Sequence, residues 1–364
     1  MLYIHIPFCK SRCIYCGFLS STENTGIADR YVEAVLTELD SRFHQFPKGY
    51  PETVYIGGGT PSFLPSSTLK KLLDGIKLRI DLSKVIEYTV EVNPDDVSPE
   101  LLDLLRANGV NRISMGIQTF DDKLLKFLNR RHTSDIARNA ILLLKEGGWN
   151  YSLDLIYGLP GQDLKDWELS LDELLGFKPP LFSAYMLSFE EYTPLGRMLD
   201  ENKVCETDED IEAEMYDLLC LKATNSGYSH YEISNFAIPG KQAVHNSRYW
   251  ENYEYVGLGA GASSFNSGKH GYNGDSIIKY INAIESGELA TEYEDEDDKD
   301  AYNTLLFIKL RTVQGVRLSD IPDKFKSDFI KKAQKLLHYD NDQYYIPEKE
   351  WLKSDFIIRE MFIL

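Results

Sequence analysis

A chain of 364 residues is long enough for one large domain and a smaller one, with an ample apolar core. Its composition, 43% apolar and 26% charged residues, is typical of a soluble globular protein. The formal net charge of −18 argues against nucleic acid as a partner, because phosphate binding needs clustered lysine and arginine. No stretch approaches the roughly eighteen apolar residues that a membrane-spanning helix requires.

Short apolar runs alternate with amphipathic helical segments along the first half of the chain. Helix N-termini are indicated by Ser98 before Pro99, by Thr133 and by Asp163, each a residue that caps helices well. The predicted strands are residues 2–6, 53–57, 86–92, 111–117, 150–156 and 181–188. Six strand–helix units in a row predict a parallel sheet with helices outside it, either closed as a barrel or doubly wound.

Cys9, Cys13 and Cys16 form a CxxxCxxC motif directly after the first predicted strand. Three thiolates in one short loop can hold an iron–sulfur cluster and leave one iron open, much as catalytic zinc keeps one position open. The spacing alone leaves a zinc site, with His5 nearby, or a redox dithiol as alternatives.

The other two cysteines and the N-terminal residues indicate the cellular compartment of the protein. Cys220 sits in an apolar helical run and is expected in the core, and Cys205 lies in a polar stretch with no partner motif. The chain runs straight into the first strand, which leaves no room for a signal peptide. Because free thiols suit a reducing compartment, we expect a cytoplasmic location.

Polar residues stand at the carboxyl end of every predicted strand, where (β/α) barrels carry their chemistry. The cysteine loop follows the first strand and the run GGGTP, residues 57–61, follows the second. Those glycines permit a close backbone approach, with bare N–H groups meeting a ligand. The other strand ends carry Glu91, Gln118, Asp154 and Tyr185. This order predicts one shared site.

The runs YIHIPFC, GGGTP, VEVNP, GIQTF, LNR and LDLIYGLP, spanning about residues 3–160, resemble the radical S-adenosylmethionine (SAM) superfamily. The likeness is to the branch that contains oxygen-independent coproporphyrinogen III oxidase and the HemW-like haem chaperones. It implies an α/β fold, a partial (β/α)6 TIM-like barrel, with a [4Fe–4S] cluster on the three cysteines and SAM chelating the open iron. The residues that fall where that family contacts SAM are Tyr3, Gly58, Gly59, Thr60, Glu91, Gln118, Arg130 and Asp154.

Two features separate the branches. The oxidase carries a fourth cysteine two residues after the third, where this chain has Phe18, as HemW-like proteins do. The segment HNSRYW, residues 245–250, matches the HNxxYW motif of the chaperones. Within it His245 is a candidate haem-iron ligand, and Tyr249 and Trp250 could stack on a porphyrin. The alternative for this segment is a hydrogen-bonded packing cluster.

Two acidic runs, residues 206–214 and 292–300, are expected to be solvated faces or linkers. Beyond the second run, the pattern predicts two helices, a hairpin near residues 339–347 and a final helix. That order is typical of a winged-helix-like α+β unit, and the acidic balance favours a lid or docking module over a DNA reader. We therefore predict a barrel at 1–225, an HNxxYW-containing extension at 226–291 and an accessory domain at 292–364.

The sequence thus favours a haem chaperone that holds a [4Fe–4S] cluster and SAM and passes haem, as cargo, to haem-requiring targets such as respiratory proteins. Peripheral contact with membrane haemoproteins and a cluster-supported dimer belong to this expectation. The alternative is a radical SAM coproporphyrinogen III oxidase that decarboxylates propionate side chains. A zinc-binding barrel is the third hypothesis. Whether the chain is an enzyme is left open.

Overall fold

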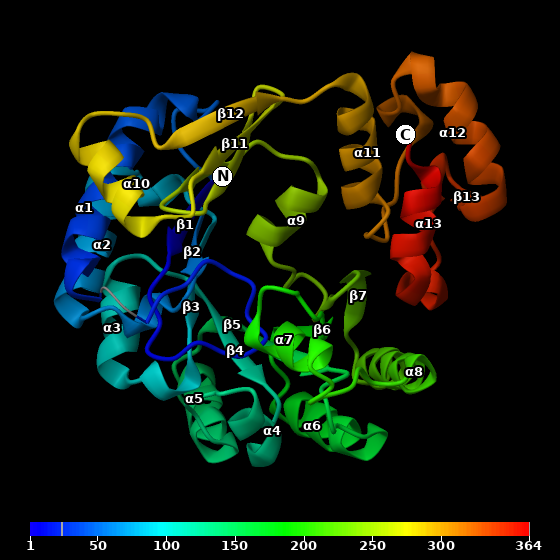
Figure 1. Cartoon of the computed structure of the whole chain (residues 1–364), viewed down its shortest axis with the longest axis horizontal. Coiled ribbons are helices and arrows are strands. Elements are labelled where there is room, and N and C mark those ends of the chain that lie inside the picture. Colours follow the sequence, from blue (N-terminus) through cyan, green and yellow to red (C-terminus); the bar gives the residue numbers. More distant parts are fainter. Residues whose placement is uncertain (23–24, 364) are drawn as a thin grey trace.

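The computed structural model describes residues 1–22 and 25–363 and shows an open nine-stranded sheet in the order β7-β8-β6-β5-β4-β3-β2-β1-β9 (Figure 1). All six predicted strands are confirmed, five of them with an end shifted by one or two residues. These strands are β1 (Leu2–Ile6), β2 (Thr53–Gly58), β3 (Glu87–Val92), β4 (Arg112–Gln118), β5 (Asn150–Tyr157) and β6 (Leu181–Met186).

Three further strands extend both edges of this parallel set. β9 (Val256–Leu258) pairs in parallel with β1, with Leu2 opposite Val256. At the other edge, β8 (Asn235–Ala237) pairs antiparallel with β6, and β7 (Ser229–Glu232) pairs antiparallel with β8. The sheet therefore curves without closing, as the predicted partial barrel requires.

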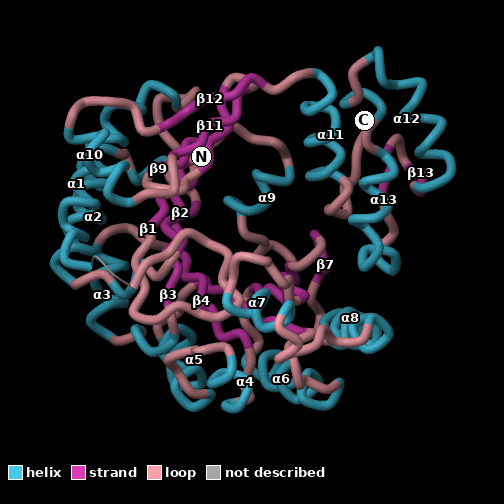
Figure 2. Tube along the Cα trace, in the orientation of Figure 1, coloured by secondary structure: helices cyan, strands magenta, loops and turns pink. Residues whose placement is uncertain are grey.

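Helices surround the outer face of the parallel strands (Figure 2). The predicted caps are confirmed: Ser98, Thr133 and Asp163 each accept a hydrogen bond from a backbone N–H in the first helical turn. The helices of this layer are α1 (Ala28–Arg42), α2 (Ser66–Arg79), α3 (Pro99–Ala107), α4 (Asp122–Phe127), α5 (Ser134–Glu146), α6 (Leu164–Phe177) and α8 (Glu209–Asn225). The short helix α7 (Pro194–Asp200) packs instead against the cysteine loop, where Leu195 donates its N–H to the Ile14 carbonyl.

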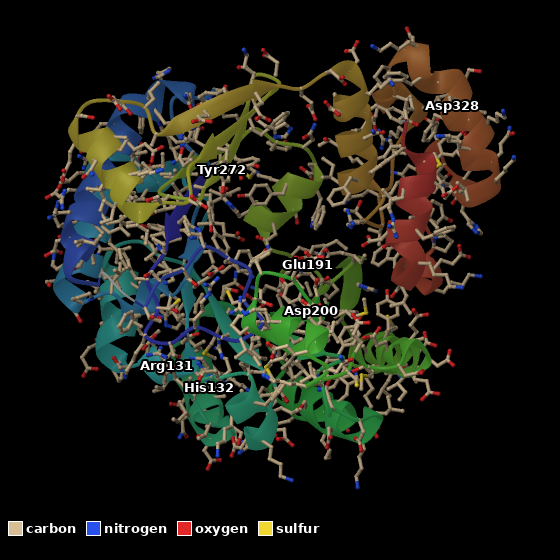
Figure 3. All side chains as sticks on the ribbon, viewed as in Figure 1. Arg131, His132, Glu191, Asp200, Tyr272 and Asp328 are labelled. Atoms are coloured by element: carbon tan, nitrogen blue, oxygen red, sulfur yellow. The ribbon has the colours of Figure 1, made fainter. Side chains whose placement is uncertain are left out.

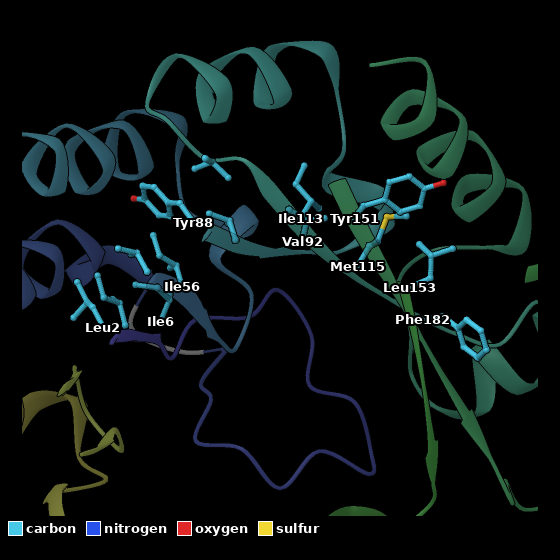
Figure 4. Close-up of a cluster of buried hydrophobic side chains, with 14 of the residues drawn as sticks. Leu2, Ile6, Ile56, Tyr88, Val92, Ile113, Met115, Tyr151, Leu153 and Phe182 are labelled. Carbon is cyan, nitrogen blue, oxygen red and sulfur yellow. The ribbon is translucent and has the colours of Figure 1, made fainter. Parts of the chain in front are cut away.

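The core lies between the strands and these helices (Figure 4). Ile56 on β2 and Val90 on β3 are fully buried, and so are Leu72 and Ile76 on α2. Successive side chains of a strand point to opposite faces, so the residues that alternate with this apolar set face inward. On β2 to β6 those inward residues include Tyr55, Glu91, Ser114, Ser152, Asp154 and Ser183.

After the barrel, the chain forms a smaller group of helices and antiparallel strands. It consists of α9 (Val244–Trp250), α10 (Ile277–Glu285) and the antiparallel strands β10 (Ser263–Asn266), β11 (Lys269–Asn273) and β12 (Thr291–Asp295). A buried ion pair between Arg42 and Glu38, both on α1, ties this group to the barrel. Arg42 also donates to the Gly257 carbonyl, and Tyr280 on α10 donates to Glu38. The acidic run that begins at residue 292 forms most of β12, and it is exposed as expected.

The C-terminal residues form the predicted order of elements: α11 (Asp298–Lys309), α12 (Asp323–Leu336), the hairpin β13 (His338–Asp340) and β14 (Gln343–Tyr345), and α13 (Ser354–Met361). Backbone hydrogen bonds join this unit to the barrel edge, from Ile233 to the Arg311 carbonyl and from Val313 to the Tyr231 carbonyl. The domain boundaries stay a prediction. Within residues 1–22 and 25–363, no helix has both the length and the apolar character needed to cross a bilayer.

Candidate functional site

The carboxyl ends of the parallel strands surround a cavity of about 630 Å³, which is in the usual range for small-molecule sites. The shared site predicted from the strand ends is therefore present. Its walls include all three motif cysteines and most of the predicted SAM contacts. The predicted residues that line it are Cys9, Cys13, Cys16, Gly58, Gly59, Thr60, Glu91, Gln118, Arg130 and Asp154.

The cysteine loop is tied down at its ends and in its middle. Cys9 donates its N–H to the Ser21 carbonyl at 3.0 Å, and Ser21 donates to the Pro7 carbonyl at 2.8 Å, which closes the loop. Ile14 donates to the Leu128 carbonyl at 3.3 Å, holding the middle of the loop against the end of α4. Three thiols are thus fixed along one wall of the cavity, all of them free of disulfides.

Burial sets the protonation of these thiols. It raises the pKa of Cys9 and raises that of Cys16 to about 11, so both are protonated at neutral pH without a metal. Thr60 Oγ1 donates to Cys9 Sγ at 3.5 Å, and Arg130 Nη1 donates to Cys13 Sγ at 3.4 Å. Iron or another thiophilic metal would displace the thiol protons, and the Thr60 and Arg130 donors would then stabilise the resulting thiolates.

The zinc alternative would require a fourth ligand, and His5 does not offer one. Its Nδ1 lies 2.9 Å from the Tyr3 hydroxyl, and its Nε2 lies 2.8 Å from the Leu19 carbonyl oxygen. Both ring nitrogens are therefore engaged away from the cysteines. Three thiols beside a ligand-sized cavity fit a cluster with one open iron better than a closed tetrahedral zinc site.

The glycine run packs the second strand against the cysteine loop. Gly58 has a φ of +111°, and a Cβ on Gly59 would lie 2.8 Å from the Ile6 carbonyl oxygen and 3.0 Å from Cys9 Sγ. The expected bare N–H groups are not free: Gly59 donates to Ile6, Thr60 to Phe8, and Gly58 to Glu91 Oε2. The glycines therefore shape the cavity wall, while their amides hold the protein together.

Two half-buried carboxyl groups stand in the cavity wall. Glu91 accepts from the Tyr55 hydroxyl at 2.7 Å, and burial raises its pKa to about 7, with the negative charge of Asp154 adding to the effect. Burial also raises the pKa of Asp154, against hydrogen bonding from Ser183 and the charge of Arg112. Such carboxyl groups favour a ligand that brings hydroxyl or amine donors.

Arg130 connects three parts of the site. Besides Cys13, its guanidinium donates to the Asn93 side-chain oxygen at 3.0 Å and to the Gly116 carbonyl at 2.5 Å, while its Nε is buried without a partner among the described residues. Gln118, at the end of β4, has a φ of +72°, a strained conformation for a residue other than glycine. An unpartnered donor and a strained backbone in one cavity are typical of a ligand site.

The segment after Arg130 is also fixed. Arg131 pairs with Asp95 and Asp96, and His132 lies 3.1 Å from the Ile117 carbonyl oxygen. Figure 3 labels Arg131 and His132, which line the cavity next to Arg130. Burial and the charge of Arg130 lower the pKa of His132 to about 3, so its ring is neutral and does not compete with Arg130 for anions.

Tyr3 is the predicted SAM contact that does not line the cavity. Its ring is 6.2 Å from that of Tyr55, which does, and its contact with SAM stays a prediction. The lining residues that sequence reasoning missed include Tyr55, Asn93, Arg112, Ser114, Ser152, Ser183 and Asn246. For the strand residues the signal was available, since they alternate with apolar positions at period two.

The HNSRYW segment forms α9, and its histidine is buried. His245 Nδ1 lies 2.8 Å from Thr53 Oγ1 and its Nε2 lies 3.1 Å from the Tyr249 hydroxyl, so the packing-cluster alternative is what the structure shows. Burial lowers the pKa of His245 to about 3. Haem ligation by His245, with stacking on Tyr249 and Trp250, stays a prediction, and it requires one of those contacts to open.

Comparison with known proteins assigns the family. The family model of the radical SAM superfamily matches residues 3–174. The heme chaperone HemW of Lactococcus lactis is 36% identical, covering 95% of this chain and 93% of that protein. The chain belongs to the HemW family of radical SAM proteins. HemW of Bacillus subtilis is 35% identical over 89% of this chain and 86% of the relative, and that of Escherichia coli is 38% identical over 72% and 68%.

The fold is also that of a solved structure. Coproporphyrinogen III oxidase (HemN) from Escherichia coli, described as a radical SAM enzyme, superposes with a TM-score of 0.86 over 99% of this chain and 89% of that chain. At 21% sequence identity, this likeness confirms the predicted fold and nothing further. At the position that separates the two branches, Phe18 lies on the cavity rim with 68% of its surface exposed.

Proposed function

We propose that this chain is a haem chaperone that binds a [4Fe–4S] cluster and SAM in the strand-end cavity and delivers haem to haem-requiring proteins. One observation carries the proposal: the three motif thiols and two half-buried carboxyl groups line a single cavity in a chain whose relatives, matched over nearly all its length, are named heme chaperone HemW. Delivery in the cytoplasm, to respiratory haemoproteins among others, belongs to the same proposal.

The residues present fit the two cofactors. Cys9, Cys13 and Cys16 would hold the cluster, which when bound supplies an iron with an open coordination position and a source of single electrons. Glu91 and Asp154 would accept hydrogen bonds from the hydroxyl or amino groups of SAM. The Arg130 guanidinium would orient Cys13 and offer its unpartnered Nε to the ligand.

The cavity rim suits an apolar cargo. Four large side chains on it are more than two-fifths exposed, which is unusual for apolar groups that lie together. They are Phe18 at 68%, Tyr192 at 61%, Met186 at 45% and Tyr185 at 41%. A flat macrocycle such as haem would cover these side chains, and an open rim would allow it to leave again, as transfer to a target requires.

The second candidate function is oxidative decarboxylation of coproporphyrinogen III. The superposition on the Escherichia coli oxidase favours it as far as fold is concerned. Phe18 argues against it, because a phenyl ring offers neither a ligand nor a hydrogen bond where the oxidase carries its fourth cysteine. A chaperone needs no such group.

One anaerobic preparation tests both. After cluster reconstitution, haem would be titrated, and coproporphyrinogen III turnover with SAM and reductant would be measured in the same sample. We expect stoichiometric haem binding and no turnover. Turnover without haem binding would reject the chaperone. The exposed Cys205, changed in Cys205→Ser, controls for non-specific haem binding by a surface thiol.

A further inference from the structure

A second group of metal-ligating side chains lies where the barrel meets the C-terminal unit, away from the cavity. It consists of Cys220 on α8, His230 on β7 and Glu348 in the short helix Glu348–Lys353. One donor atom from each lies within 4.8 Å of the other two. Figure 1 shows the elements that carry them, with α8 and β7 at the barrel edge that faces α13.

Cys220 is placed differently from the core position expected for it. It is half-buried, and its Sγ lies 3.9 Å from His230 Nδ1. Burial raises the pKa of its thiol to about 12, with the Glu348 carboxylate adding to the effect. A partly accessible thiol between an imidazole and a carboxylate has the donor types that zinc-class metals prefer.

The imidazole of His230 faces only acceptors. Its Nε2 lies 3.3 Å from the Ile233 carbonyl oxygen, and its Nδ1 lies 2.8 Å from Glu348 Oε1. A carbonyl oxygen and a carboxylate can both only accept, so a neutral ring, with one N–H, can donate to only one of them; with that proton on Nε2, the lone pair of Nδ1 faces the carboxylate and the thiol. That arrangement needs a positive charge between them, either a proton or a metal ion.

The ring is also fixed in this orientation. It stacks on Phe236 with centroids 4.0 Å apart, and Trp351 packs edge-on against it at 4.5 Å. A carbonyl that holds one ring nitrogen while the other faces a metal is the usual support of a histidine ligand. The Glu348 side chain is half-exposed, so it can adjust by a small rotation.

Tyr216 supplies an independent observation. It is one helical turn before Cys220 on α8, 4% exposed, and its hydroxyl makes no hydrogen bond of normal length among the described residues. The same hydroxyl nevertheless lies close enough to the Cys220 thiol to lower its pKa against the effect of burial. The thiol therefore engages this buried hydroxyl only weakly, and a metal-bound water in the remaining position would give it a full hydrogen bond.

We propose that Cys220, His230 and Glu348 bind one zinc-class divalent cation, which fastens the C-terminal unit to the barrel. Tetrahedral zinc holds sulfur, nitrogen and oxygen ligands about 3.3–3.6 Å from one another, and the observed separations of 2.8 and 3.9 Å bracket that range. Binding exchanges the thiol proton of Cys220 for the metal, and the proton leaves to solvent. Tyr216 would bind the water in the fourth position.

The probe is Zn²⁺, added to the cluster-reconstituted full-length chain so that iron already occupies the motif cysteines. After desalting, zinc would be counted by mass spectrometry, and thermal unfolding would be followed with and without it. We expect about one equivalent of zinc and a higher Tm in the wild type and in Cys205→Ser. In Cys220→Ser and His230→Gln, zinc should be lost together with the Tm shift.

Glu348→Gln serves as the variant least able to disturb folding, because its side chain is half-exposed. It should keep the wild-type Tm without zinc and lose at least about tenfold in zinc affinity. Absence of zinc from the loaded wild type would leave an ordinary His230–Glu348 ion pair and overturn the proposal. Equal zinc in the wild type and in Cys220→Ser, with folding intact, would overturn it as well.

Discussion

Replacing Glu91 by glutamine should make the cofactor-free protein more stable at alkaline pH. The half-buried carboxyl has its pKa raised from 4.5 to about 7, so between these values the folded state binds more protons than the unfolded state. Stability from this group is therefore fully present below pH 4.5 and is lost as the pH rises through 7. The introduced glutamine would keep the contacts with Tyr55 and Gly58, since its amide can donate to the tyrosine oxygen and its oxygen can accept from the backbone.

The magnitude follows from the pKa shift. A rise of about 2.5 units corresponds to roughly 3 kcal/mol, of which about 2.5 kcal/mol is lost between pH 5 and pH 8. The wild type should lose about that amount more unfolding free energy over this interval than Glu91→Gln does, because the contribution of Glu91 is absent from the variant. At the same time the variant should bind SAM about 10- to 100-fold more weakly, because a charged acceptor for the ligand is gone.

Urea unfolding of the cofactor-free chain at pH 5 and pH 8, followed by circular dichroism, measures the difference. Glu232 provides the matched control, since burial also raises its pKa to about 7 but it lies on β7, outside the cavity. Glu232→Gln should reduce the pH dependence similarly and leave SAM affinity unchanged. Wild type and Glu91→Gln with the same pH dependence would refute the reasoning.

Three further predictions concern the cavity and the HNSRYW segment. Gly59→Ala places a Cβ against the Ile6 carbonyl and Cys9 Sγ, so we expect the free energy of unfolding in urea to fall by about 1–3 kcal/mol and less iron to bind. Gly176→Ala, whose Cβ meets nothing within 4 Å, should retain the wild-type stability and iron content. Equal iron content in the two variants would contradict this prediction. Cys13→Ser should abolish iron–sulfur absorbance, and Cys205→Ser should preserve it. If His245 ligates haem, the absorbance spectrum of the bound haem should be constant from pH 5 to 8, because the pKa of this imidazole is lowered to about 3. Loss of ligation near pH 6.5 would indicate that an exposed histidine is the ligand instead.

The elements that the sequence predicted well are those whose signal is local. Ile56 and Val90 belong to apolar runs bounded by turn residues, and Ser98 precedes a proline at a helix start, so short windows contain the information. The cysteine motif and the glycine run are likewise each complete within a few residues. Because parallel strands end at the same edge, their assembly into one site follows from topology.

The parts that were missed depend on distant contacts. β7, β8 and β9 are only three or four residues long, and β9 is a strand because Val256 pairs with Leu2, which lies at the other end of the barrel sequence. His245 fits a ligand or a core residue equally well in sequence, because its decisive partner, Thr53, is 192 residues away. No short window contains that hydrogen bond. The hydrogen bonds from the Gly59 and Thr60 amides to the carbonyls of Ile6 and Phe8 were hidden for the same reason.

Three features of the cavity wall weaken the protein without its ligands: the raised pKa of Glu91, the strained backbone of Gln118 and an Arg130 nitrogen without a partner among the described residues. Each becomes favourable only when something in the cavity supplies donors, acceptors or metal, so they point to ligand binding at this position. His245 is the opposite case, with both ring nitrogens satisfied inside the protein. These energetic features favour the cavity as the site of the proposed cofactors, and they favour the exposed rim around Phe18 over the filled position of His245 for the proposed haem cargo.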